Sequence, residues 1–440
     1  MKIACIADLH LNKATYKNVM DRDEFTSLPF RCGDFMRAFR WSVNECIKLK
    51  VDLLVIGGDT YDTYSPNNEV RGFFSLQLQR LISEKIPVII LVGNHDICMK
   101  HSALSDIEEL GLKNIKVFSE PGIINLENGG KKFRLLLFPH TINMERKLTT
   151  IRKEYDKFVS TLPKDPSDTT LFFGHFPVYG CVMNHYNLGE DSDVLDSSIL
   201  MVSETKKTVE ETDQTTTLIL KGEYKNVNKE DLNASDLVKS GAQYIFMGDF
   251  HEHQAIVKTQ KCKGWYCGSL EKNSLNEKEH TKGFMVYDSS KAPTEDMGCC
   301  EFIPNPYVRP MMDLPGNIVE MREKLEKFSE DKYQDVIVRL NFKGTKEEMT
   351  DFTVNLESFK KEISSRFNAI HIYHNIDSIE NNAGDVISKI EKQIQSKGHM
   401  DAVDVLEVVK EMVCERVTDD NEKEKIVELA TEIYKETMGA

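Results

Sequence analysis

The stretch IPVIILVGNHD (residues 86–96) joins an apolar run to three polar side chains, Asn94, His95 and Asp96. A short run rich in Val and Ile is typical of a strand that is buried on both faces. The polar residues begin where the run stops, so we expect them at the carboxyl end of this strand. This one segment therefore predicts a buried strand with a polar cluster at its end.

The same pattern occurs in four other segments, which are KIACIADLH (2–10), VDLLVIGGDTYD (51–62), TLFFGHFPV (170–178) and QYIFMGDFHEHQ (243–254). Helical periodicity separates the first three strands, in residues 33–49 and 67–84. Strands that alternate with helices predict a layered α/β sheet. Because ligands collect at the carboxyl ends of strands in such sheets, we expect the five polar clusters to form one site.

Two of the clusters place their side chains two positions apart. Asp8 and His10 follow the first run, and Asp249 and His251 follow the last. Residues two apart on a strand point to the same face, so each pair is a candidate to bind one ion. The other oxygen and imidazole candidates are Asp59, Asn94 and His175. A set with these groups and without thiolates suits Mn²⁺, and also Fe²⁺ or Zn²⁺.

This ligand set is typical of phosphoryl chemistry, in which two cations about 3.5–4 Å apart hold the phosphate and activate water. Asp59 follows two glycines, which let the backbone turn tightly, so its carboxylate is a candidate to bridge two ions. His95 is a candidate to stabilise the transition state or to protonate the leaving oxygen. Asp96 is a candidate to orient His95. The sequence thus predicts a dinuclear centre with a catalytic histidine.

The order of the clusters resembles the calcineurin-like metallophosphoesterase superfamily, with D-x-H, G-D-x-x-D, G-N-H-D, a single His and G-H-x-H. Within it, the chain is similar to the SbcD-type DNA-repair nucleases. GDTYDTY (58–64) lacks the Arg of the Ser/Thr protein phosphatases, and YCGSLEKNSLNEKEHTKGFMVYD (266–288) is similar to the G-S-L-[ED]-R segment and K-G-F strand of the nucleases. The resemblance implies an α/β fold, a layered αββα metallophosphoesterase sandwich with a small α+β capping domain and a helical C-terminal tail.

The resemblance also implies a division of the ligands between two divalent ions, with Mn²⁺ expected and Mg²⁺ as the alternative. One ion would be held by Asp8, His10, Asp59 and His251, and the other by Asp59, Asn94, His175 and Asp249. His95 would be catalytic, and Asp62 would pack beside the ligands. An Asp replaces the first His of G-H-x-H at position 249. We expect Asp249 to remain a ligand, and the alternatives are that His251 and His253 are the ligand pair or that the second metal site is impaired.

Changes in composition along the chain predict its domains. We expect a nuclease domain over 1–290 with a polar insertion at about 181–235, then a Pro-rich linker over 291–315. A DNA-capping α+β domain is expected over 316–380. The tail, 381–440, has the spacing of amphipathic helices. It would either pack on the capping domain or bind an ATPase partner.

The resemblance implies a nuclease that acts on DNA, as an exonuclease on duplex ends and an endonuclease on single strands, in repair, recombination or replication. The chain has no P-loop motif, and the implied partner is an SbcC-type coiled-coil ATPase. A homodimer through the helices of residues 66–110 is also implied. The alternatives are a phosphoesterase acting on small phosphodiesters or phosphoproteins, and a scaffold subunit that has lost catalysis.

The composition limits other classes of function. The net charge of −15 over 440 residues argues against a diffuse basic coat for nucleic acid, although bound cations would offset a carboxylate-rich site. No apolar run approaches the roughly 20 residues of a membrane span, and the N-terminus lacks the pattern of a signal peptide. The ten cysteines include no C-x-x-C motif. We therefore expect an intracellular, cytoplasmic protein without membrane contact.

Overall fold

The computed structural model describes residues 1–440 except 99–100, 166, 180, 182–231 and 380–440. The chain divides into two compact units, Met1–Pro310 and Met311–Ala440. Nearly all of the predicted insertion at 181–235, and all of the predicted helical tail at 381–440, lie outside the described residues.

Two six-stranded sheets form the centre of the first unit. In spatial order, the first sheet contains β14 (Cys300–Pro304), β13 (Gly283–Asp288), β1 (Lys2–Ile6), β2 (Leu53–Gly57), β3 (Val88–Leu91) and β6 (Ile115–Phe118). The second sheet contains β11 (Gln254–Lys258), β12 (Lys263–Tyr266), β10 (Tyr244–Gly248), β9 (Thr169–His175), β8 (Lys131–Phe138) and β7 (Gly122–Asn128). The five predicted strands are β1, β2, β3, β9 and β10. They run parallel within each sheet, so their carboxyl ends lie at one edge of it.

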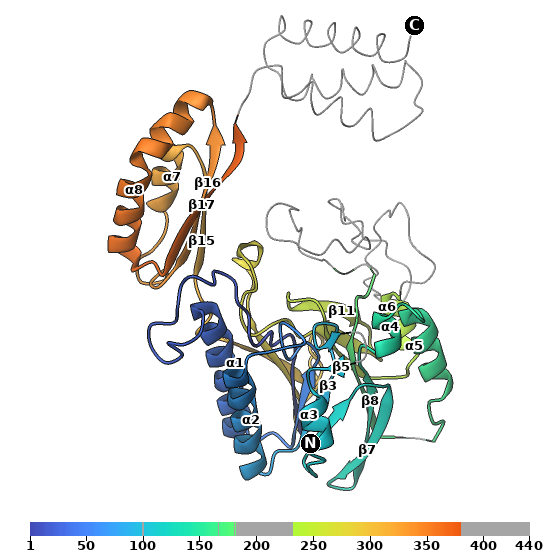
Figure 1. The fold of residues 1–440 in the computed structure, drawn as a ribbon. Coiled ribbons are helices and arrows are strands. Elements are labelled where there is room, and N and C mark those ends of the chain that lie inside the picture. Colours follow the sequence, from blue (N-terminus) through green and yellow to red (C-terminus); the bar gives the residue numbers. More distant parts are fainter. Residues whose placement is uncertain (99–100, 166, 180, 182–231, 380–440) are drawn as a thin grey trace, which may run out of the picture. The chain divides into compact units, whose positions relative to one another are not determined.

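Helices cover the outer face of each sheet and produce the expected αββα layers (Figure 1). The helices on the first sheet are α1 (Phe30–Leu49), α2 (Asn68–Ser83) and α3 (Ser105–Glu109), and those on the second are α4 (Ile142–Glu145), α5 (Ile151–Ser160) and α6 (Ala234–Val238). A third apolar core lies between the sheets. The predicted fold class is therefore confirmed.

Side chains alternate along β1 in the way that this layering requires. Ala4 and Ile6 belong to the core under α1 and α2, whereas Ile3 and Cys5 belong to the core between the sheets. All four are buried, because each face of the strand is covered by a layer. This explains why the strand is an uninterrupted apolar run in the sequence.

Short elements follow two of these strands. After β3, the chain forms a small antiparallel pair, β4 (Ile97–Cys98) and β5 (His101–Ser102). After β12, it forms a single 3₁₀ turn over Leu275–Glu277. Both lie in segments that carry polar residues of the site described below.

The segment expected to be a linker, 291–315, instead contributes strands to both units. β14 pairs antiparallel with β13 and extends the first sheet, while β15 (Met311–Gly316) is a strand of the second unit. The prolines are tolerated because both strands lie at the edge of their sheets. The Pro-rich composition therefore did not indicate a linker here.

The described part of the second unit, up to Ile379, is a three-stranded parallel sheet, in the order β15-β16-β17, with two helices. Its other elements are α7 (Ile318–Leu325), β16 (Ile337–Gly344), α8 (Lys346–Phe367) and β17 (His371–Ile379). Asn317 caps α7 and Thr345 caps α8, each in a reciprocal capping box with the glutamate three residues later. These strands and helices make the described part of this unit an α+β arrangement.

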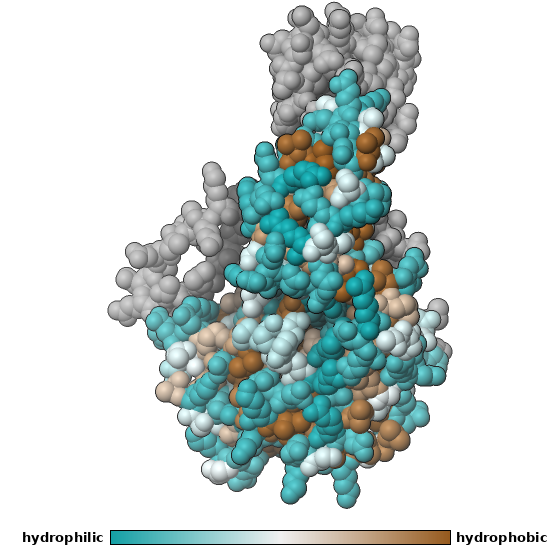
Figure 2. Space-filling view, turned by 90° about the vertical axis from the view of Figure 1, so that its left-hand side faces the viewer, coloured by the Kyte–Doolittle hydropathy of each residue, from teal (hydrophilic) through white to brown (hydrophobic). Residues whose placement is uncertain are grey.

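The described surface on the side drawn in Figure 2 is mainly hydrophilic, with hydrophobic residues in scattered groups. Exposed apolar side chains do occur, such as Leu110 at 65% and Val354 at 76%. Among the described residues, no helix is both long and apolar enough to cross a membrane. Apolar side chains of the described residues thus lie mainly in the cores between the layers.

Candidate metal centre

Asp8 and His10 lie in a loop rather than on a strand. β1 ends at Ile6, and the two residues adopt left-handed backbone angles, with φ of 52° and 41°. The prediction that they share one face of a strand was therefore wrong. Backbone hydrogen bonds fix the loop instead, from Asp8 N to Gly58 O (3.2 Å) and from His10 N to Asp59 O (3.0 Å). Positive φ values are uncommon for residues other than glycine.

Asp59 and Asp249 also have positive φ, of 48° and 99°. Both follow a strand directly, Asp59 after β2 and Asp249 after β10. The backbone turns sharply at each carboxylate, so Asp249 and His251 likewise do not share a strand face. Four of the seven predicted ligands thus have positive φ angles. This backbone conformation directs their side chains into the space between the two sheet edges.

Glycines let the two sheets approach at this edge. Gly58 has φ of 95°, and a Cβ there would lie 2.1 Å from Nδ1 of His175. A Cβ on Gly248 would lie 2.3 Å from the carbonyl oxygen of Gly57. Neither position has room for a side chain.

The first candidate subsite contains Asp8, His10 and His251. Nε2 of His10 lies 3.0 Å from Nε2 of His251. The opposite nitrogen of each ring faces a carboxylate, since His10 Nδ1 is 3.1 Å from Asp62 Oδ1 and His251 Nδ1 is 2.9 Å from Glu277 Oε1. When each ring carries its proton on the nitrogen that faces the carboxylate, the two Nε2 lone pairs point at one another. Such an arrangement requires a cation or a proton between them.

The second candidate subsite is centred on His175. Its Nδ1 donates to the carbonyl oxygen of Gly57 (2.8 Å), which directs the Nε2 lone pair inward. Nε2 faces the acceptor oxygens of Asn94 at 3.0 Å, Asp59 at 3.3 Å and Asp249 at 3.9 Å. These atoms repel one another unless a positive charge lies among them.

Asp59 connects the two subsites. Oδ1 faces His175, and Oδ2 lies 3.8 Å from Nε2 of His10. Oδ2 of Asp8 is buried and has no hydrogen-bond partner, which is costly for a carboxylate oxygen. The oxygen and imidazole donors therefore fit two divalent cations, with Asp59 shared between them. Asp8, His10 and His251 would complete one subsite, and Asn94, His175 and Asp249 the other.

The pKa values of the candidate ligands reflect this crowding. Burial raises the pKa of Asp8 to about 6 and lowers that of His10 to about 4. Burial opposes charge on His175 as well, but the carboxylate of Asp59 outweighs it and raises the His175 pKa well above its usual value. For His251, Glu277 outweighs burial and raises the pKa. The neighbouring carboxylates thus favour a proton on His175 and on His251, whereas burial disfavours one on His10.

Metal affinity is therefore expected to increase with pH. Below their raised pKa values, His175 and His251 each hold a proton that a cation must displace, and Asp8 adds another below about pH 6. Each displaced proton weakens binding by about tenfold per pH unit below the pKa of its group. Calorimetric titration of Mn²⁺ from about pH 6 to about pH 8, in buffers that differ in ionisation enthalpy, measures the released protons. Binding that is independent of pH and releases no protons would contradict this account.

His95 is the exposed candidate at this site. Its ring lies edge-on to that of His10, with centroids 4.9 Å apart, and its Nδ1 is 3.1 Å from the carbonyl oxygen of Asp62. Its backbone N–H donates to Asp59 Oδ1 (2.9 Å). Contacts with Asp59 and with the backbone of Asp62 therefore fix His95. Nε2 is the ring nitrogen of His95 that makes neither contact.

Asp96 does not orient His95, contrary to the prediction. It is fully buried, and its two oxygens accept backbone N–H bonds from Thr60 (3.1 Å), Tyr61 (2.9 Å) and Gly93 (2.9 Å). Burial raises its pKa to about 7. Asp96 thus holds the loop that carries Asp59 against the loop that carries Asn94.

The two candidates for the remaining ligand differ in their surroundings. Asp249 Oδ1 lies 3.9 Å from Nε2 of His175, and its backbone N–H donates to Asp8 Oδ1 (2.9 Å). His253 instead places Nδ1 2.9 Å from the carbonyl oxygen of Tyr266 and stacks on Phe302, with centroids 4.0 Å apart. This geometry favours Asp249 as the ligand.

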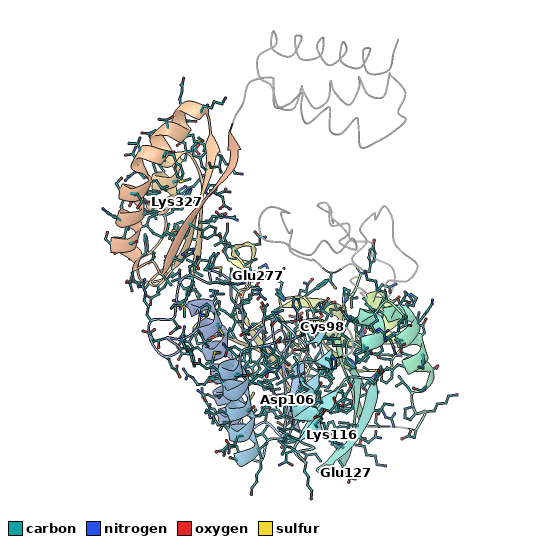
Figure 3. The ribbon with its side chains drawn as sticks, viewed as in Figure 1. Cys98, Asp106, Lys116, Glu127, Glu277 and Lys327 are labelled. Atoms are coloured by element: carbon teal, nitrogen blue, oxygen red, sulfur yellow. The ribbon has the colours of Figure 1, made fainter. Side chains whose placement is uncertain are left out.

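Three residues near the site were missed by the sequence analysis, namely Asn273, Glu277 and Lys282. All are buried, and all lie in the segment between β12 and β13, where Figure 3 labels Glu277. Glu277 contacts His251 and also pairs with Lys282 (2.5 Å). Their only signal in the sequence was the similarity of residues 266–288 to a nuclease segment, which does not say what each side chain contacts.

Comparison with known proteins found relatives that match parts of this chain. One subunit of the nuclease SbcCD, from Staphylococcus epidermidis, is 24% identical over 297 residues, which cover 66% of each chain. DNA double-strand break repair protein Mre11 is 32% identical over 116 residues in Archaeoglobus fulgidus and over 123 residues in Sulfurisphaera tokodaii. These matches cover 26% and 27% of this chain, but only 24% and 29% of the relatives.

A family model, the calcineurin-like phosphoesterase, matches residues 1–253. The match includes β1, β2, β3, β9 and β10 and all seven predicted metal ligands. It covers more than half of the 440 residues. The fold, the site at the strand ends and this match together show that the chain belongs to the calcineurin-like phosphoesterase family.

Proposed function

We propose that the chain is a dinuclear-metal nuclease that hydrolyses phosphodiester bonds in DNA, at duplex ends and within single strands. The observation that carries the proposal is the pair of carboxylate and imidazole subsites that share Asp59, with the exposed His95 beside them. Such a pair fits the two-cation clamp of phosphoryl transfer. The choice of DNA among phosphate esters rests on the relatives, which are named as a nuclease and as DNA double-strand break repair proteins.

When bound, the two cations lower the pKa of water and offset the charge that develops on the phosphoryl group. Asp59 fixes the spacing between the two subsites. His95 holds its Nδ1 on the carbonyl oxygen of Asp62, which leaves Nε2 to exchange a proton with the leaving oxygen. Asp96 prevents the loops that carry Asp59 and His95 from separating.

The proposed cations are Mn²⁺, with Mg²⁺ as the alternative, since the donors are hard oxygens and imidazoles. The proposed partner is an SbcC-type coiled-coil ATPase, because the relative from Staphylococcus epidermidis is named as one subunit of SbcCD. A homodimer is proposed on the resemblance to SbcD-type nucleases.

Replacing His95 by Ala is expected to lower DNA hydrolysis by about 100-fold or more while both subsites still bind Mn²⁺, because His95 acts on the leaving group. End-labelled linear duplex, circular single strands and bis(p-nitrophenyl) phosphate would be incubated with Mn²⁺, with Mg²⁺ and with chelator. His101→Ala, at an exposed histidine on β5, is the matched control. Unchanged hydrolysis by His95→Ala would remove His95 from the mechanism.

The same assay separates the other functions. Hydrolysis of the small diester with DNA left intact would establish a small-molecule phosphoesterase and overturn the nuclease. Inactivity of the wild type toward all substrates, with an SbcC-type ATPase present, would indicate a scaffold subunit.

A further inference from the structure

Buried residues of the segment between β12 and β13 contact both the backbone and the ring of His251. Lys282 is 1% exposed and donates to three acceptors, the carbonyl oxygen of His251 (2.9 Å), Ser269 Oγ (2.9 Å) and Glu277 Oε2 (2.5 Å). An ammonium group has three donors, so every one of them is used. The backbone N–H of Ser269 also donates to the carbonyl oxygen of His251 (3.1 Å).

Glu277 connects this arrangement to the imidazole. It is 3% exposed, and Oε1 accepts from Nδ1 of His251 (2.9 Å), while Oε2 accepts from Lys282 and from the backbone N–H of Asn273 (3.0 Å). The amide of Asn273 lies 2.9 Å from the same Nδ1. With Glu277 accepting the Nδ1 proton, Nε2 is the atom that faces His10 and the first subsite.

A buried ion pair such as Glu277–Lys282 adds little to stability, because the cost of removing both charges from water offsets their attraction. Stability thus does not account for the pair. The pair instead fixes the tautomer and the direction of the His251 imidazole. When a carboxylate accepts a hydrogen bond from the nitrogen that does not bind the metal, the histidine becomes a stronger metal ligand.

We propose that Glu277, held by Lys282, is a positioning residue that presents Nε2 of His251 to the cation of the first subsite and sets the affinity of that subsite. The inference rests on the proposed dinuclear centre. It assigns a role to the segment 266–288, which had been recognised only by its similarity to a nuclease segment. The second subsite, around His175, has no contact with Glu277 among the described hydrogen bonds and would not depend on it.

Mn²⁺ titration of Glu277→Gln by calorimetry tests the proposal without measuring activity. We expect one of the two sites to weaken by about 10- to 100-fold and the other to bind as in the wild type. Hydrolysis would recover at high Mn²⁺, so that the variant changes the Mn²⁺ requirement more than the maximal rate. Glu279→Gln is the matched control, because Glu279 is exposed in the same segment. Two unchanged sites in Glu277→Gln would overturn the proposal.

A second measurement does not depend on whether that variant folds. In wild-type protein loaded with Zn²⁺, the ¹⁵N shifts of His251, assigned by comparison with His251→Gln, report which ring nitrogen carries the proton. The proposal expects a proton on Nδ1, and a bare Nδ1 would overturn it. These results differ from those expected if the nuclease proposal fails. In that case the wild type would bind two cations and show this tautomer but would leave DNA intact.

Discussion

Asp59→Asn is expected to lower phosphodiester hydrolysis by about 10⁴-fold, which corresponds to about 5–6 kcal/mol of transition-state stabilisation. Asp59 faces both subsites, with Oδ1 3.3 Å from His175 and Oδ2 3.8 Å from His10. An amide is neutral and can present only one oxygen, so it cannot bridge two cations. The loss is larger than that expected for His95→Ala because both cations depend on Asp59.

Metal titration and hydrolysis would be measured on the same preparation of Asp59→Asn. Both sites should weaken together, which distinguishes Asp59 from Glu277, whose replacement should weaken only one. Asp156→Asn is the control, because Asp156 is exposed on α5. Retention of one site with wild-type affinity would show that Asp59 is not shared.

Asp34→Ala is expected to destabilise the first unit by about 3–5 kcal/mol. Asp34 is 5% exposed and accepts from Arg31 (2.6 Å), Arg37 (2.9 Å) and Nε of Arg309 (3.0 Å). Burial raises its pKa, but the arginines outweigh burial and hold the pKa below its usual range. Without Asp34, the guanidinium of Arg31, at 1% exposure, keeps the more distant Glu271 (3.5 Å) as its charged partner among the described residues.

Urea unfolding followed by tryptophan fluorescence measures this loss, because both tryptophans, Trp41 and Trp265, lie in the first unit. Glu45→Ala is the control on the same helix. Glu45 pairs with the exposed Lys48, and a surface pair contributes less than about 1 kcal/mol. Equal unfolding midpoints for Asp34→Ala and the wild type would contradict the expected role of the buried network.

The strands and their polar clusters were predictable because the two signals are local. A buried strand must be apolar on both faces, and each cluster begins where the apolar run stops, as at Gly93-Asn94 and Gly174-His175. Parallel pairing then brings the strand ends together. The seven predicted ligands accordingly follow strands, or end them, at the neighbouring edges of the two sheets.

Backbone direction and long-range contacts were not predictable in the same way. Asp8 and His10 were assigned to a strand because alternation continues through them, but their left-handed angles arise from hydrogen bonds to residues 58 and 59. Asp96 follows His95 in the chain, yet its carboxylate turns inward to backbone donors. Glu277 contacts His251 across 26 residues, and nothing in its neighbours distinguishes it from the exposed Glu279.

The candidate ligands come from both halves of the sandwich. Asp8, His10, Asp59 and Asn94 follow strands of the first sheet, whereas His175, Asp249 and His251 belong to the ends of strands of the second. Between these edges, the contacts that oppose sliding include two hydrogen bonds, Asp249 to Asp8 and His175 to Gly57. Bound cations would link the edges of the two sheets. The stability of the first unit would therefore increase with the concentration of free metal.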